Sequence, residues 1–424
     1  MGIVLIVSFF ILMLIGFPVV IAIALPAIVY VFANGFPVEL ISLRMHYALD
    51  SYPLLAIPIF IYAGNLMNHT GVTDRIFKFA DLSVGRVHGG LAQVNIFAGL
   101  MFASMSGAAL AAVGGLGPVT LKSMQEKGYD KPFAAAVTVS SATVGPMFPP
   151  SIPFIIYGAV ASVSIVKLFL AGIIPSLIIV ALLMITTAII AKIRKYPRAD
   201  TWPSFTDLKK SFYPASPALA APVILVGGLL TGIFTPTEAA TVMVVYVILI
   251  SLFIYKQLKI SHLIDAALQT IRTSVSILII ISAASLFGWI LAVEQIPQVF
   301  ASSILTLTQN PVHLLMIITI LLIIVGMFLD STTATLLVVP IIAPPLVQAG
   351  VDPVHLGVVT ILNLMVGLVT PPLGLSLFLI SNIAKMPVNQ VLKGVLPFLI
   401  PLLVTLLLVT FIPAISLFIP NMLN

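Results

Sequence analysis

Two short stretches place helix-breaking residues inside long apolar runs: "VGPMFPPS" begins at Val144 and "VGLVTPPL" begins at Val366. Each proline removes a backbone N–H, which costs about 3 kcal/mol in a helix interior. The carbonyl oxygens freed by such a break can coordinate a cation. The helix that starts after the break presents N–H groups and roughly half a positive charge to an anion. The two stretches therefore predict ion-binding chemistry inside the apolar part of the chain.

A single acidic side chain, Asp330 in "GMFLDSTT", lies in the interior of its apolar run. A carboxylate at membrane depth is a functional candidate, and here it would add a formal charge to a cation site. The sequence "DSTT" is also typical of a helix N-cap, so capping is an alternative role that can coexist with cation binding. Other reactive groups are scarce, because the chain has no cysteine and its six histidines lack metal-ligand spacing.

The composition places these residues in a membrane protein. Hydrophobic residues make up 60% of the 424 positions and charged residues 8%, whereas soluble domains carry about 25% charged residues. Several apolar runs, such as 168–191, 274–293 and 395–419, reach or approach the roughly 20 residues that cross a bilayer. The first run, "MGIVLIVSFFILMLIGFPVV", lacks a basic start and a cleavage site, so it is predicted to be a retained first helix. The net charge of +6 is assigned to loops near lipid headgroups.

The second stretch lies 222 residues after the first, and the same offset relates further glycine, proline and aspartate positions. Matches of these residue types are much harder to obtain from composition than apolar matches, so they indicate an internal duplication. The matched pairs are Pro118 and Pro340, Gly128 and Gly350, Asp130 and Asp352, Thr138 and Thr360, Gly172 and Gly394, and Pro175 and Pro397.

The positive charges predict that the two copies are inverted. The basic segments 192–210 and 256–272 are separated by two apolar spans, so both can face the cytoplasm, where Lys and Arg are retained. Counting spans outward from them places the lysine-containing turn 122–131 inside and the equivalent turn 347–353 outside. No Lys or Arg occurs between Arg272 and Lys385. Inverted repeats are typical of secondary transporters.

Each copy is predicted to contain a re-entrant hairpin followed by a broken transmembrane helix. The hairpins span 90–122, with "SMSGAA" at the tip, and 311–348, with "DSTT" at the tip, and the broken helices span 132–161 and 354–384. Non-helical backbone at membrane depth survives only where protein buries it or water lines it. The predicted organisation of this all-α polytopic membrane protein is scaffold helices at 1–85, a first transport repeat at 86–185, a basic linker with further scaffold helices at 186–295, a second transport repeat at 296–391 and a C-terminal helix at 392–424.

Eight motifs carry a resemblance to a known family, in order along the chain: "SMSGAALAAVGGLG", "KGYD", "VGPMFPPSIPFIIYG", "LFLAGIIPSLI", "GIFTPTEAA", "GMFLDSTT", "NLMVGLVTPPLGLSLF" and "KGVLPFLIP". They resemble the large membrane subunit of the tripartite ATP-independent periplasmic (TRAP) transporters, from about Gly16 to Pro420. The resemblance implies a multi-pass, non-enzymatic protein of the bacterial inner membrane that imports an organic acid with Na⁺. It implies two partners, a small four-helix membrane subunit and a periplasmic substrate-binding protein. It also implies an elevator mechanism, in which a transport domain moves against a scaffold.

Carried over by position, the resemblance implies one sodium site at each pair of tip and break, with a substrate site between the tips. The absence of arginine from both tips and both broken segments means that a carboxylate would be held by N–H groups, hydroxyls and helix dipoles. No organic cofactor is expected. The residues are, for the first sodium site, Ser104, Ser106, Gly145 and Pro149; for the second, Asp330, Gly367, Thr370 and Pro371; and for the substrate, Ser106, Pro150, Ser151, Thr332 and Pro372.

Three functions stay open at this point. Sodium-coupled uptake within a TRAP complex leads, a self-sufficient sodium/dicarboxylate carrier of similar inverted-hairpin architecture is second, and a channel or membrane enzyme is third. An enzyme would need a nucleophile or metal cluster, and none is found in the sequence. The motifs do not fix the substrate, which could be a C4-dicarboxylate, a sialic acid or another keto or sugar acid.

Overall fold

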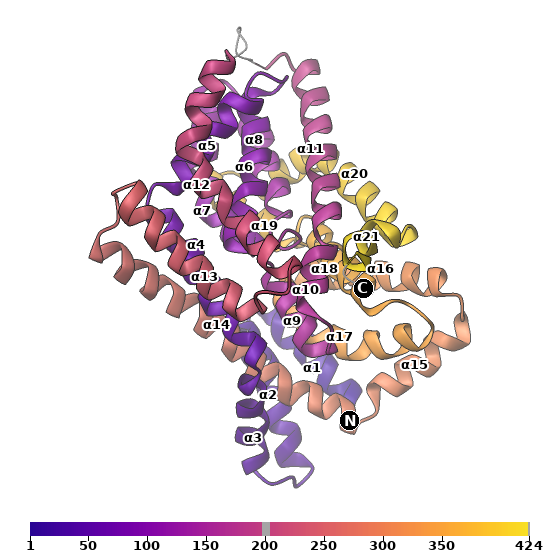
Figure 1. The fold of residues 1–424 in the computed structure, drawn as a ribbon. Helices are drawn as coiled ribbons and strands as arrows, with labels where there is room; N and C mark the ends of the chain where they lie inside the picture. Colours follow the sequence, from indigo (N-terminus) through magenta and orange to yellow (C-terminus); the bar gives the residue numbers. More distant parts are fainter. Residues whose placement is uncertain (197–203, 423–424) are drawn as a thin grey trace.

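A computed structural model of the chain describes residues 1–196 and 204–422, without the side chains at positions 73, 74, 103–106, 116 and 205. Within these ranges the regular structure is helical, with no β-strand, as the sequence predicts. Seven of the described helices are long and apolar enough to cross a membrane, which confirms the all-α polytopic fold. The chain forms an elongated bundle with the N-terminus and α1 to α3 toward one end and α5, α8 and α11 toward the other (Figure 1).

The helices of the first half and those of the second half follow one another without other regular structure between them. The first half contains α1 (Gly2–Ile15), α2 (Val19–Ala33), α3 (Glu39–Tyr47), η1 (Ala48–Asp50), η2 (Tyr52–Leu55), α4 (Ala56–His69), α5 (Val72–Val84), α6 (Gly90–Ser106), α7 (Ala109–Glu126), α8 (Lys131–Ala142), α9 (Ile152–Ala161), α10 (Ile165–Ala171) and α11 (Ile173–Ile193). The second half contains α12 (Phe205–Leu230), α13 (Pro236–Leu249), η3 (Ile250–Ile254), α14 (Ile260–Val293), α15 (Ile296–Leu307), α16 (Pro311–Phe328), α17 (Ser331–Gln348), α18 (Pro353–Leu368), α19 (Leu375–Ala384), α20 (Val388–Phe411) and α21 (Ala414–Asn421).

Helix boundaries recur at the offset found in the sequence. Both ends of α17 lie 222 residues after the corresponding ends of α7, and α6, α8 and α9 correspond in the same way to α16, α18 and α19 within a few residues. The breaks fall where the Gly and Pro pairs are, at 143–151 and 369–374. Proline cannot donate the next helical hydrogen bond, so the chain stops being helical at these positions. The duplicated sequence thus forms a duplicated set of helices.

The first apolar run does not form the single helix expected from the sequence. Gly16 ends α1 in the left-handed conformation, with φ at 98°, and Phe17 donates its N–H to the carbonyl of Leu12 at 3.1 Å. This glycine-terminated end closes the helix, and Pro18 then precedes the start of α2. A helical hairpin of α1 and α2 therefore replaces the predicted first helix. The composition of the run is apolar throughout, so hydropathy alone could not locate this end.

The single C-terminal helix predicted over 392–424 is also wrong. The structure has α20, which starts before this range, and a separate α21. Ile412 between them has φ −122° and ψ 81°, which is not helical. Steric contact with the ring of a following proline disfavours the helical conformation for the preceding residue, and Pro413 is that proline.

One end of the molecule is held together by Glu294, which follows α14. Its Oε1 accepts the hydroxyl of Tyr30 at 2.6 Å and its Oε2 accepts the N–H of Gly2 at 2.8 Å. These contacts, the Tyr30 hydrogen bond foremost, lower the pKa of Glu294 to about 2. The carboxylate is therefore ionised at neutral pH and joins the start of α1, the end of α2 and the end of α14.

The opposite end brings the first hairpin next to the basic linker. Arg194, just after α11, forms an ion pair with Asp130 at 3.2 Å. The turn between α7 and α8 and the start of the basic segment 192–210 thus share one end, as the charge distribution predicts. Residues 197–203 of that segment lie outside the described residues.

A cysteine at Ser204 is expected to react with membrane-impermeant thiol reagents only when the cytoplasmic face is open to them. Ser204 is exposed at the N-cap of α12, and the Lys and Arg excess around it assigns it to the cytoplasm. Because the chain has no cysteine of its own, the single-cysteine variant gives a clean signal. If the reagent labels this cysteine from outside intact cells, Ser204 faces the periplasm and the predicted orientation is wrong.

Candidate functional site

The tip of the first hairpin, between α6 and α7, touches the first break directly. The carbonyl of Gly107 accepts the N–H of Ile152, the first residue of α9, at 3.4 Å. Gly107 has a φ of 59°, and a Cβ there would lie 2.7 Å from the carbonyl oxygen of Pro150. Glycine is thus required here on conformational and steric grounds. Of the nine positions 143–151 in this break, all are buried except Phe148, which is half-buried.

The second hairpin, formed by α16 and α17, packs backbone against backbone on the second break. Gly374 donates its N–H to the carbonyl of Met327 at 2.9 Å. A Cβ on Gly367 would lie 2.6 Å from both the Cα and the carbonyl carbon of Gly326. The approach of α16 to α18 therefore depends on the absence of a side chain at both glycines.

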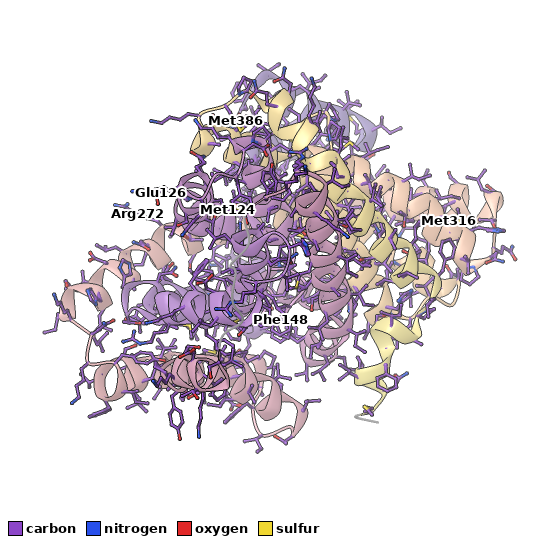
Figure 2. The ribbon with its side chains drawn as sticks, turned by 90° about the horizontal axis from the view of Figure 1, so that it is seen from above. Met124, Glu126, Phe148, Arg272, Met316 and Met386 are labelled. Carbon is purple, nitrogen blue, oxygen red and sulfur yellow. The ribbon has the colours of Figure 1, made fainter. Side chains whose placement is uncertain are left out.

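Four helices begin at these two contacts and pack as crossed pairs. α9 starts after the first break and packs on α17, which starts at the second tip, while α19 starts after the second break and packs on α7. In the second pair, a Cβ on Gly117 would lie 3.5 Å from Ile380. Seen from above, Phe148 of the first break lies among the central helices, whereas Met316 of α16 lies toward the edge (Figure 2). The two repeats therefore share one central region.

The double prolines leave one backbone carbonyl of each break without a helical donor. Pro146 and its repeat equivalent Leu368 are each followed, three and four positions later, by prolines, which have no N–H. In the first break the hydroxyl of Ser151 donates to the Pro146 oxygen, and the Ser151 oxygen accepts the N–H of Phe154 at 3.2 Å. The position equivalent to Ser151 is Leu373, which has no hydroxyl to offer. The Leu368 oxygen is therefore left without this partner.

Two carbonyl oxygens of the second break lie close to Gly374. The N–H of Gly374 is the helical partner expected for the Thr370 carbonyl, but it donates to Met327 instead. A Cβ built on Gly374 would lie 2.9 Å from the Thr370 oxygen, 3.2 Å from the Leu368 oxygen and 2.9 Å from Cδ1 of Leu377. Both oxygens therefore lie beside Gly374, next to the apolar side chain of Leu377. Neighbouring backbone carbonyls suit a partly dehydrated monovalent cation.

Asp330 caps α17, which is one of the two roles considered for it from the sequence. Its Oδ2 accepts the N–H groups of Thr332 at 2.9 Å and Thr333 at 3.3 Å, and its Oδ1 accepts the Thr333 hydroxyl. Two carboxylate oxygens offer about four lone-pair sites, so these three bonds leave acceptor capacity for a cation. Asp330 follows Met327 by three residues, so this charge belongs to the tip that contacts the second break.

The four central helix starts differ in capping. Ser151 caps α9 and Asp330 caps α17, whereas α7 starts after Ala108 and α19 after Gly374 without a side-chain cap. Since α7 and α19 pack together, two uncapped N-termini belong to one pair. The second break is also the more accessible one, because Pro372 is exposed while its equivalent in the first break is buried. Among the described side chains none caps either N-terminus, so this pair offers N–H groups for an anion.

Comparison with known proteins decides the family. Residues 6–415 match the family described as the tripartite ATP-independent periplasmic transporter, DctM component. The chain belongs to this family. As a TRAP DctM component it is part of a transporter rather than an enzyme, and it is a multi-pass protein of the bacterial inner membrane.

The TRAP chain is similar to two named relatives and to one solved structure. It is 40% identical over 411 residues to the sialic acid TRAP transporter large permease protein SiaM of Vibrio cholerae, covering 96% of this chain and 95% of that one. It is 37% identical to the C4-dicarboxylate TRAP transporter large permease protein DctM of Pseudomonas aeruginosa, covering 91% and 90%. The crystal structure of the Alcanivorax borkumensis YdaH transporter has the same fold, with a TM-score of 0.64 at 15% identity, covering 88% of this chain and 86% of that one.

The structure places most of the sequence-predicted residues of this TRAP chain at the tip and break contacts. The side chains of Ser104 and Ser106 lie outside the described residues. Ser151 uses its hydroxyl within the first break, and Thr370 donates its hydroxyl to the Val366 carbonyl at 2.6 Å. The first break contains Gly145, Pro149, Pro150 and Ser151, the second break with its preceding turn contains Gly367, Thr370, Pro371 and Pro372, and the second tip contains Asp330 and Thr332.

Three positions with clear structural roles were missed from the sequence. Gly107 and Gly374 make the contacts between tips and breaks, and Leu368 carries the carbonyl that has no helical donor. A signal for Leu368 was present, because a residue three and four positions before a double proline loses both helical donors. Gly374 lies two positions after the double proline, where the next helix can start. It was missed because the chain has 27 glycines and its sequence context does not distinguish this one.

Proposed function

We propose that this chain imports an organic acid together with Na⁺ as the large subunit of a TRAP transporter. The observation that carries the proposal is that the Leu368 and Thr370 carbonyl oxygens both lie beside Gly374, in the break that contacts the hairpin bearing Asp330. Two neutral carbonyls and a carboxylate form an oxygen-only ligand set suited to a hard monovalent cation. Gly367 and Pro371 shape the backbone that presents these oxygens.

The first sodium site that we propose, at Gly145 and Pro149, differs in its chemistry. Its repeat-equivalent carbonyl, at Pro146, already accepts the Ser151 hydroxyl. The tip equivalent of Asp330 is Ala108, so no formal charge is supplied there. A cation at this site would depend on other backbone carbonyls and on Ser104 and Ser106. We therefore expect the second site to bind Na⁺ more tightly.

The organic acid is proposed to bind where α7 and α19 begin. Their uncapped N-termini supply N–H groups and aligned helix dipoles, which stabilise a carboxylate without an arginine. Pro372 and Thr332 lie on the adjoining break and tip, and Pro150 and Ser151 on the opposite break. The names of the relatives cover a sialic acid and C4-dicarboxylates, both of which carry a carboxylate. The shared chemistry is an organic acid.

We further propose that the hairpins and broken helices move as one transport domain. The backbone contacts of Gly107 with Ile152 and of Gly374 with Met327 fasten each tip to its break. The scaffold packs on these helices at two places, where α4 and α5 pack on α6 and where α14 packs on α17. A body whose tips and breaks are fastened to each other can move as a unit, as an elevator movement requires.

Uptake by this chain is expected to require a small four-helix membrane subunit and a periplasmic substrate-binding protein. Reconstituted alone in liposomes with an inward sodium gradient, the chain should accumulate little organic acid, and adding both partners should restore uptake. The measurement is uptake of radiolabelled candidate acids with and without the gradient. Robust gradient-driven uptake by the chain alone would favour the alternative, a self-sufficient sodium/dicarboxylate carrier.

Replacing Leu373 with serine is expected to weaken sodium binding at the second site. The new hydroxyl would donate to the Leu368 carbonyl, as Ser151 does to Pro146, and would compete with the cation. A net hydrogen bond of about 1 kcal/mol corresponds to about a fivefold rise in half-saturating sodium. Leu373→Ala is the matched control, because it removes the same side chain without adding a donor. Equal sodium curves for the two variants would remove the Leu368 carbonyl from the site.

A further inference from the structure

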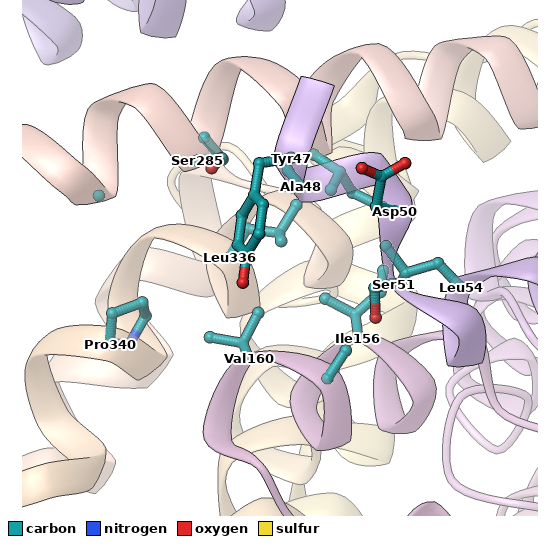
Figure 3. A pocket seen from close by; sticks show the side chains of 14 residues that line it. Tyr47, Ala48, Asp50, Ser51, Leu54, Ile156, Val160, Ser285, Leu336 and Pro340 are labelled. Carbon is teal, nitrogen blue, oxygen red and sulfur yellow. The ribbon is translucent and has the colours of Figure 1, made fainter. Parts of the chain in front are cut away.

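A cavity of about 520 Å³ lies between the scaffold and the transport repeats. One wall is the scaffold segment 47–54 with α14, and the other is formed by α9 and α17. In the close-up, the ring of Tyr47 projects into the space toward Val160 of α9, while Asp50 lies at the rim (Figure 3). None of the residues assigned above to sodium or substrate lines it. Its volume is that of a site for a small organic molecule.

The internal repeat shows that this cavity has no counterpart at α7. The repeat equivalents of its lining residues Leu336 and Pro340 are Gly114 and Pro118 of α7, at the 222-residue offset. Those positions are exposed, and a Cβ on Gly114 would meet nothing within 4 Å. The transport repeats therefore lie against the scaffold at α17 and stand open at α7. A ligand bound between α17 and α14 would favour this arrangement over one in which α17 separates from the scaffold.

The polar groups on the cavity wall are hydrogen-bond acceptors or hydroxyls. Pro340 and Pro344 have no N–H, so the carbonyls of Leu336 and Pro340 lose their helical donors. Asp50 is the one charged residue of the lining, and it has no ion-pair or hydrogen-bond partner among the described residues. The hydroxyls come from Tyr47, Ser51 and Ser285. None of the described residues that line the cavity is basic, so its wall carries no positive charge of its own.

We propose that this cavity binds a primary amine with an apolar body, and that the bound amine holds α9 and α17 against the scaffold. The ammonium group would supply three donors and a positive charge to Asp50 and to the carbonyls of Leu336 and Pro340. The apolar body contacts Ile156, Val160 and the Tyr47 ring, which also attracts a cation. An organic acid is excluded because its carboxylate would face Asp50.

The ammonium chemistry has two sources, a soluble amine and the ethanolamine headgroup of a phospholipid. Binding of the amine to the cavity does not depend on the proposed transport function. The inhibitory half rests on the proposed function, since an amine that holds one conformation slows import only if the domain moves. Binding and uptake are therefore measured separately.

The binding test uses the full chain in nanodiscs of phosphatidylcholine and phosphatidylglycerol, titrated calorimetrically with 4-phenylbutylamine. The neutral 4-phenylbutanol and the anionic 4-phenylbutyrate are the matched probes. The amine should bind at least about tenfold more tightly than the alcohol, and the acid should not bind, because only the amine pairs with a carboxylate. Asp50→Asn should remove the preference for the amine, whereas Asp265→Asn, an acid of α14 that does not line the cavity, should keep it.

Two further experiments test where the amine binds and whether its natural source is a lipid headgroup. Gly288→Val places a side chain into the cavity, where a Cβ meets nothing within 4 Å, and should abolish amine binding without unfolding the protein. If nanodiscs containing phosphatidylethanolamine suppress binding of the soluble amine in an Asp50-dependent way, the lipid headgroup is the natural occupant. Amine binding that survives both Asp50→Asn and Gly288→Val, or no binding in any nanodisc, overturns the proposal. Asp50-dependent binding with unchanged uptake in the full complex overturns its inhibitory half alone.

Discussion

Replacing Gly367 with alanine is expected to abolish uptake and lower the thermal stability of the protein. The added Cβ would lie 2.6 Å from backbone atoms of Gly326 and 2.8 Å from the carbonyl oxygen of Ile323. Backbone atoms cannot rotate away as a flexible side chain can, so α16 and α18 must separate. Overpacking of this kind costs about 1–3 kcal/mol, which outweighs the roughly 1 kcal/mol by which alanine favours a helix over glycine.

The loss of uptake should exceed the loss of stability. Separating α16 from α18 displaces Met327 and with it the contact to Gly374 that orients the carbonyls of the second break. Uptake and sodium dependence are measured in liposomes with the full complex, and thermal unfolding is measured in parallel.

The repeat supplies a matched control for this variant. Gly145 is the equivalent of Gly367, but a Cβ there would lie 3.3 Å from its nearest neighbouring atom, the Ala142 carbonyl oxygen. Gly145→Ala should keep most of its uptake, and Gly114→Ala, where nothing lies within 4 Å, should keep all of it. If Gly367→Ala and Gly145→Ala behave alike, the tight packing of the second break has no functional role.

The sequence predicted the periodic parts of this fold well. Hairpins, breaks and repeat equivalence follow from Gly, Pro and Asp at a constant offset, since these residues dictate where a helix can start and stop. The second hairpin, predicted at 311–348, has helices with these outer bounds in α16 and α17. The errors came from single residues inside uniformly apolar runs, Gly16 and Pro413, whose effect hydropathy does not register.

The chemistry of the site was harder to predict because it depends on pairs of residues. That Ser151 satisfies a carbonyl in one break, and that Leu373 fails to do so in the other, is visible only once the hydroxyl is seen to reach Pro146. The cavity at Tyr47 and Asp50 was missed entirely. Its walls come from four separate segments of the chain, 47–54, 156–160, 281–288 and 336–340, and no sequence motif links them.

Two repeats with the same backbone plan are thus expected to bind Na⁺ with unequal affinity. The duplication supplies two breaks and two tips, and point differences decide which break keeps a free carbonyl and which tip keeps a charge. At the second break both differences favour a cation. Leu373 provides no hydroxyl to the Leu368 oxygen, and the second tip has Asp330 where the first tip has Ala108. A cation should therefore prefer the second site, and its removal should be most evident there.

Replacing Asp330 with asparagine is accordingly expected to weaken sodium coupling while the protein stays folded and inserted. The Asn oxygen can still accept the N–H groups of Thr332 and Thr333, and the Thr333 hydroxyl can turn to accept from the new amide. Asparagine is as good an N-cap as aspartate, so the stability of α17 should change little. The formal charge, however, is lost.

The size of the effect follows from Coulomb's law. A charge and a monovalent cation about 4 Å apart interact by about 4 kcal/mol at an effective dielectric constant of 20. Losing even a third of this would raise the half-saturating sodium concentration about tenfold. The measurement is uptake against sodium concentration for the wild type and Asp330→Asn in liposomes that contain the full complex, with thermal unfolding as the check on folding.

Asp352→Asn is the matched control, because Asp352 caps α18 with the same pattern of two N–H groups, those of Val354 at 2.8 Å and His355 at 3.0 Å. It lies at the far end of α18 from the second break, so its charge should not contribute to the sodium site. Asp352→Asn should therefore leave the sodium curve unchanged. An unchanged curve for Asp330→Asn as well would reduce Asp330 to a cap, and if Asp330→Asn fails to fold, Asp330→Glu tests the same charge with the acid retained.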